Sequence, residues 1–140
     1  MKTLPLALVL AASTLATLPA LAQDAVCGLA GGTPIAEAEA VNALVKEAKF
    51  DELAAALSAT ITGLAPDAFD GVKGAYPEAF TTCTTLVQRQ DVGGLSQHVV
   101  VFEGANPLFV YWAVANFQGK VGVVSFNMDS TFVPVMDMLR

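Results

Sequence analysis

Basic side chains are scarce in this sequence, and they are not clustered. Seven lysine and arginine residues stand against 13 aspartate and glutamate residues, so the formal charge at pH 7 is −6. Nucleic acids and anionic membrane surfaces attract clustered positive charge. The sequence therefore predicts a chain that binds neither of them.

Residues that commonly carry chemistry are also few. The chain has one histidine, His98, and two cysteines, which cannot supply a typical four-ligand zinc site. None of four serines considered has the Gly-x-Ser-x-Gly setting of a hydrolase nucleophile: Ser58, Ser96, Ser125 and Ser130. We expect no metal and no cofactor, and we favour a non-catalytic domain over an enzyme.

Only the N-terminus carries a long apolar run. The uncharged stretch from Thr3 to Ala22 follows Lys2 and ends in small residues around Leu21. This form is typical of a secretory signal peptide, here residues 1–22. An uncleaved membrane anchor is the alternative, because about 20 apolar residues can span a bilayer. We favour cleavage, and expect an exported chain, periplasmic or secreted, without a stable membrane anchor.

The two cysteines, Cys27 and Cys83, lie in the part of the chain that would be exported. In an oxidising compartment the natural interpretation is a disulfide, with a metal-binding pair as the weaker alternative. The bond would close a loop of roughly 57 residues and contribute on the order of 4 kcal/mol by the chain-entropy estimate. It would attach the N-terminal arm to the body of the domain.

The order of hydrophobic patterns predicts an α+β fold. Residues 23–32 lack a period and are expected to form an extended arm, residues 33–130 a single domain, and residues 131–140 an apolar tail. Helices are predicted near residues 33–48, 51–63 and 66–74. Strands are predicted near residues 82–92, 95–104, 108–118 and 121–128. We expect the N-terminal helices to pack on one face of a curved four-stranded antiparallel meander. Glu37, Glu39 and Glu47 are expected to form the solvated face of the first helix.

The stretch from Leu108 to Asp129 is apolar at both odd and even positions, so both faces of the sheet need cover. Two-residue turns would place Arg89 opposite His98, and Ala113 opposite Phe126; a Gly104–Pro107 loop would place Phe102 opposite Phe109. These registers put Phe102 and Tyr111 on the helix side. The second face then centres on Trp112 and five valines: Val99, Val101, Val110, Val114 and Val123.

Three short helices can cover only one face, so the Trp112 face needs another occupant. We favour a second copy or another exported protein, with Trp112 as the anchor. The C-terminal tail or the N-terminal arm could instead fold over this face, or a small apolar ligand could fill it.

The predicted order is helices followed by a curved sheet that has an aromatic strand, a Gly hairpin and the Val-x-Ser-Phe-Asn strand from Val123 to Asn127. This pattern resembles the cone-shaped superfamily of nuclear-transport-factor-like and cystatin-like domains. The pattern covers about residues 33–130. The resemblance implies a domain that often dimerises through the open sheet face. Because this fold hosts both enzymes and binding domains, it does not by itself imply a reaction.

Enzymes of that superfamily place Tyr, His, Asp or Arg inside the cone. The equivalent candidates here are Arg89, Asp91, His98 and Tyr111, which share one parity in the predicted registers. His98 would be a general base oriented by Asp91, and Arg89 would bind an anionic group. The alternative to a binding domain is therefore a small-molecule enzyme or carrier that uses a cone pocket.

Overall fold

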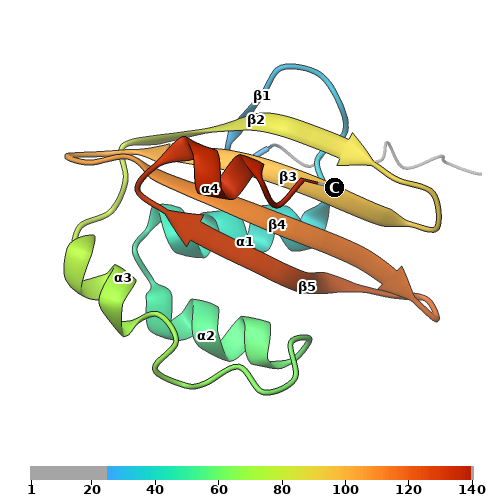
Figure 1. The fold of residues 1–140 in the computed structure, drawn as a ribbon, viewed down its shortest axis with the longest axis horizontal. Helices are drawn as coiled ribbons and strands as arrows, with labels where there is room; N and C mark the ends of the chain where they lie inside the picture. The colour runs from blue at the N-terminus through green and yellow to red at the C-terminus, as the bar shows by residue number, and fades with distance from the viewer. Residues whose placement is uncertain (1–24, 140) are drawn as a thin grey trace, which may run out of the picture.

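The computed structural model describes residues 25–139. The predicted signal peptide lies outside these residues. The helices are α1 (Ala36–Lys46), α2 (Phe50–Ser58), α3 (Asp70–Ala75) and α4 (Phe132–Met136). The strands are β1 (Gly28–Leu29), β2 (Thr82–Gln90), β3 (Leu95–Glu103), β4 (Leu108–Phe117) and β5 (Lys120–Asp129) (Figure 1). The predicted α+β class is confirmed. None of the described helices is long and apolar enough to cross a membrane.

The sheet has five strands in the order β1-β2-β3-β4-β5. Hairpins connect β2 through β5, and each of these strands is antiparallel to its neighbour. The sequence analysis missed β1, which pairs parallel to β2 through Gly28 and Leu29. The sheet is therefore mixed, and part of the predicted extended arm belongs to it.

The predicted disulfide between Cys27 and Cys83 is confirmed, with an S–S distance of 2.10 Å. Cys27 immediately precedes β1, and Cys83 lies in β2 next to Thr84, the partner of Gly28. The covalent bond thus holds the arm beside β2, where two residues of backbone pairing alone would be a weak attachment.

The first helix begins later than predicted. The predicted range began at Thr33, but α1 starts at Ala36 and has no side-chain cap. The backbone carbonyl of Thr33 instead accepts a hydrogen bond of 2.8 Å from Nε2 of Gln88 in β2. Thr33 therefore contacts the sheet before the helix begins.

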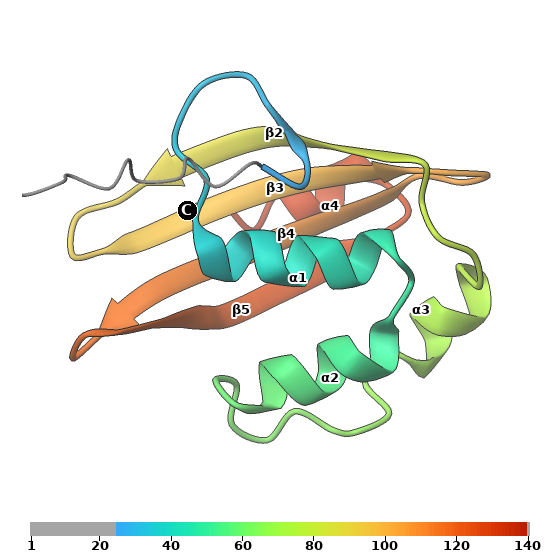
Figure 2. The ribbon, with the colours of Figure 1, turned by 180° about the vertical axis from the view of Figure 1, so that it is seen from behind.

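Two layers of helix enclose the sheet. Helix α1 packs against β4 and β5 on one face, with α2 beside it (Figure 2). Helix α4 packs against β4 and β5 on the opposite face (Figure 1). The larger core lies on the α1 side and includes Phe50, Phe102 and Trp112.

The predicted register is wrong by one residue at the β3–β4 hairpin. Phe102 pairs with Leu108 and not with Phe109, so residues 104–107 between the strands do not form the symmetric loop that the prediction assumed. Since side chains alternate across a sheet, this shift turns all of β4 over. Trp112 therefore points toward α1, where the sequence analysis had placed Tyr111.

The other two predicted registers are also wrong. Arg89 pairs with Gln97, because the N–H of Asp91 donates to the carbonyl of Leu95 at 2.8 Å and leaves three residues, 92–94, in the turn, the last two of them glycines with positive φ. Ala113 pairs with Ser125. The β4–β5 turn consists of Gln118 and Gly119, with φ of 53° and 80°, the backbone form that favours a two-residue hairpin. Gln118 is an unusual residue for this conformation, so the sequence pattern favoured Gly119 and Lys120 as the two turn residues.

The C-terminal tail covers the second face of the sheet. Val135 of α4 is fully buried against Val99, Tyr111 and Ala113. Met136, Met138 and Leu139 extend the same cluster. The alternative in which the tail folds back over the sheet is therefore the one observed.

Replacing Val135 with alanine should lower the free energy of unfolding by about 1–3 kcal/mol, because it leaves a cavity under α4. Val133 on the same helix is 65% exposed, and Val133→Ala should change stability by less than about 0.5 kcal/mol. Urea denaturation of both variants tests this. Equal effects would contradict the docked position of α4.

Candidate functional site

Three of the four predicted site residues lie on the α4 face of the sheet. Nε of Arg89 donates to Oδ1 of Asp91 at 2.7 Å, and the amide of Gln97 donates to the other oxygen of Asp91. The hydroxyl of Tyr111 donates to Oε1 of Gln97 at 2.9 Å. The hydrogen bond from Arg89, followed by that from Gln97, lowers the pKa of Asp91. Gln97, which the sequence analysis did not select, joins the other three.

His98 lies on the opposite face. Its Cα partner is Trp112, and its Nε2 lies 2.8 Å from Oγ of Ser96, with both side chains buried. Burial lowers the pKa of the imidazole, which favours the neutral form. The sheet separates His98 from Asp91, so the predicted pairing of a base with an orienting carboxylate is wrong.

The predicted interface residues are enclosed within one chain. Trp112 is fully buried, and Val110, Val114 and Val123 join it in the core beneath α1. Val99 lies on the other face under α4. Val101 is partly buried. An exposed patch centred on Trp112 is therefore not present, because the shifted β4 register turns its large residues inward.

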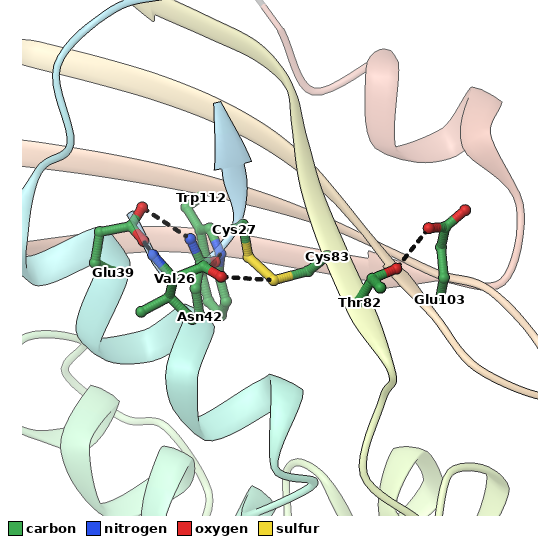
Figure 3. The surroundings of a disulfide bond; sticks show 8 residues. All are labelled: Val26, Cys27, Glu39, Asn42, Thr82, Cys83, Glu103 and Trp112. Carbon is green, nitrogen blue, oxygen red and sulfur yellow. Dashed lines mark hydrogen bonds between the residues drawn. A yellow bond between two sulfur atoms is a disulfide. The ribbon is translucent and has the colours of Figure 1, made fainter. Parts of the chain in front are cut away.

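A chain of hydrogen bonds crosses this core beside the disulfide (Figure 3). Nε1 of Trp112 donates to Oδ1 of Asn42 at 2.8 Å. Nδ2 of Asn42 donates to Oε1 of Glu39 at 3.4 Å, and Oε2 of Glu39 accepts the backbone N–H of Val26. These contacts connect the N-terminal arm, α1 and β4.

Glu39 was expected on a solvated face, but only 6% of it is exposed. The signal for its burial is its position three residues before Asn42, which puts both polar side chains on one side of α1. Because Asn42 is 1% exposed and Trp112 is enclosed, this network serves structure and offers a substrate no access.

A surface groove of about 390 Å³ lies where the α3–β2 connection meets the β3–β4 hairpin. Its lining comes from two segments of the chain, residues 75–81 and 104–106. The Tyr76 and Phe80 rings lie side by side, with centroids 5.5 Å apart. The other apolar lining residues are Ala75, Pro77, Ala79 and Ala105.

Both ends of the longer lining segment are fixed to the body of the domain. The hydroxyl of Tyr76 donates to the carbonyl of Pro107 at 2.9 Å. The N–H of Phe80 donates to the carbonyl of Lys46 at 2.7 Å, and the N–H of Thr81 donates to that of Glu103 at 2.8 Å. Because these contacts position the two rings in advance, little ordering would be needed on binding.

The sequence analysis missed this groove. Residues 75–81 and 104–106 are connections without a hydrophobic period, and their meeting depends on the fold. The only local signal was Tyr76-Pro77, an aromatic residue before a proline in the segment that separates helices from strands.

Comparison with protein-family models, curated proteins and solved structures finds no match to this chain. Within residues 25–139, no group of three or more His, Cys, Asp or Glu side chains could hold a metal ion.

Replacing Asn42 with alanine should lower the free energy of unfolding by roughly 2–4 kcal/mol, because it leaves the Trp112 N–H and the Glu39 carboxylate without this partner. Glu37→Ala on the same helix is the control and should change little. In a Trp112→Phe background the Asn42→Ala effect should shrink by about 1 kcal/mol. Urea unfolding of the four chains measures this coupling, and strictly additive effects would contradict it.

Stability should decrease when the pH falls below about 6.5, the ordinary pKa of histidine, because the unfolded chain then binds a proton that buried His98 resists. Above this pH the lowered pKa of His98 costs no stability. Below it, the free energy of unfolding falls by up to about 1.4 kcal/mol per pH unit. His98→Gln should reduce the difference in unfolding free energy between about pH 7.5 and about pH 5.5. An unchanged difference would show that His98 does not carry it.

Proposed function

We propose that this chain is a non-catalytic exported binding domain that uses the groove between residues 75–81 and 104–106. The observation that carries the proposal is a groove lined by the partly buried Tyr76 ring and by Phe80, of which 6% is exposed. The Tyr76 hydroxyl and the backbone N–H groups of Phe80 and Thr81 hold the lining segment in place. Its volume lies in the range of small-molecule sites, and its wall combines apolar side chains with a few polar groups.

The arrangement of the predicted catalytic residues supports binding over catalysis. Arg89, Asp91 and Tyr111 join one network, while His98 lies across the sheet. The groove and two further pockets in residues 25–139 are lined by none of these four side chains.

The space between the helices and the sheet is filled by side chains. Phe69 and Phe126 have ring centroids 5.1 Å apart, and Trp112 follows at 6.2 Å from Phe126. Phe102 is fully buried in the same core. The cone pocket required by the enzyme alternative is therefore occupied by the protein itself.

The disulfide supports the exported location in this proposal. Bonds between cysteines persist in oxidising compartments and are rare in the cytosol. The N-terminal sequence has the form of a signal peptide, which would deliver the chain to such a compartment.

The groove should bind a small aromatic compound with millimolar affinity, since few atoms contribute to so small a complex. The test is a titration of the exported, oxidised, ¹⁵N-labelled chain with 2-phenylethanol, followed by amide chemical shifts. Shifts should concentrate at residues 75–81 and 104–106 and should saturate.

Gly104→Leu supplies the blocking variant, because a side chain at this position would grow beside the ring of Phe80. Gly71→Leu on α3 is the matched control, since nothing lies within 4 Å of its Cβ position. Binding should be lost in the first variant and kept in the second. Shifts scattered over the domain, or equal binding by both variants, would contradict the proposed site.

A further inference from the structure

Negative charge surrounds the groove. Glu78 lines it and makes no ion pair within residues 25–139. The carboxylate of Glu103, which precedes the short lining segment, accepts a hydrogen bond of 2.7 Å from the Thr82 hydroxyl. Asp129 acts on the Tyr76 hydroxyl, whose pKa is raised first by burial and then by this charge.

No positive charge offsets these carboxylates at the groove. None of its ten lining residues is lysine or arginine. Lys73, two residues before the lining begins, donates to Asp51 on α2. Lys46 contributes its backbone carbonyl to Phe80, but its side chain does not line the groove.

The aromatic wall of the groove also favours a positively charged ligand. The face of an aromatic ring attracts a cation within about 6 Å, and an apolar body can pack on the remaining ring surface. Gly104 adds no side chain over this wall, since a Cβ there would lie 3.4 Å from Cδ1 of Phe80. Only 6% of Phe80 is exposed, so the aromatic surface in the groove comes mainly from the partly buried Tyr76 ring, and the exposed Glu78 lines the same groove.

We infer that the groove binds an organic cation, an ammonium or guanidinium group carried on an apolar body. Glu78 supplies the charge, and the Tyr76 ring, which packs on buried Phe80, supplies the surface for the apolar part. The same chemistry is offered by a free amine and by a lysine or arginine side chain of another protein. The inference rests on the proposed function, since it names the ligand class of that groove.

Three probes of matched shape test the preferred ligand class and the location of the site independently. Phenethylammonium, 2-phenylethanol and phenylacetate differ mainly in charge, and each is titrated into the exported, oxidised chain with amide shifts as the readout. The ammonium probe should bind about fivefold more tightly than the alcohol, as one exposed cation–aromatic contact and one surface ion pair together allow. Phenylacetate should bind most weakly.

Glu78→Gln removes the charge and keeps the shape of the side chain. It should bring the affinities for phenethylammonium and 2-phenylethanol together, whereas Glu52→Gln on α2 should leave their ratio unchanged. The preference for the cation should also weaken in high salt, because the carboxylate is exposed. Comparable spectra of both variants establish that the fold is retained.

Each outcome has a distinct meaning. Equal binding of alcohol and ammonium at the groove overturns the cation inference and leaves the proposed function standing. Failure of all three probes to shift residues 75–81 and 104–106 overturns both. A capped Ala-Lys-Ala peptide then separates the sources: binding comparable to phenethylammonium indicates a side chain of another protein, and weaker binding indicates a free amine.

Discussion

The hydrogen bond from Trp112 to Asn42 determines which face of the sheet the helices cover. A buried indole N–H needs an acceptor, and the acceptor here projects from α1. Asn42 is also bound to Glu39, which accepts the N–H of Val26 beside the disulfide. Shifting β4 by one residue would turn the indole away and leave two buried polar side chains without this connection.

This polar chain supplies information that hydrophobicity cannot. β4 is apolar on both parities, so burying either set of side chains would remove similar apolar area from water. The indole, amide and carboxylate can be satisfied in only one of these arrangements. The polar groups therefore specify the register, while the apolar residues on both faces stabilise the sheet once the register is set.

The same distinction explains how far the sequence could predict the structure. The α+β class followed from helical and strand periods, and the Cys27–Cys83 bond followed from there being two cysteines. The registers did not follow, because loops of two and three residues have similar glycine-containing sequences, and Gln118 adopts a positive φ. The burial of Glu39 and the meeting of residues 75–81 with 104–106 depend on contacts between distant segments, which no local pattern records.

Because both faces of the sheet are covered within one chain, the proposed binding groove lies at the rim of the sheet. Helix α1 and its aromatic core fill one side, and α4 with Val135 covers the other. The groove lies at the end of the sheet, where the connections leave the regular pairing and Gly104 adds no side chain. The Tyr76 hydroxyl bonds the carbonyl of Pro107, and the N–H groups of Phe80 and Thr81 bond the carbonyls of Lys46 and Glu103. Phe80 itself belongs to the larger core, with its ring centroid 5.6 Å from that of Phe102, so the core forms part of the wall of the proposed binding groove.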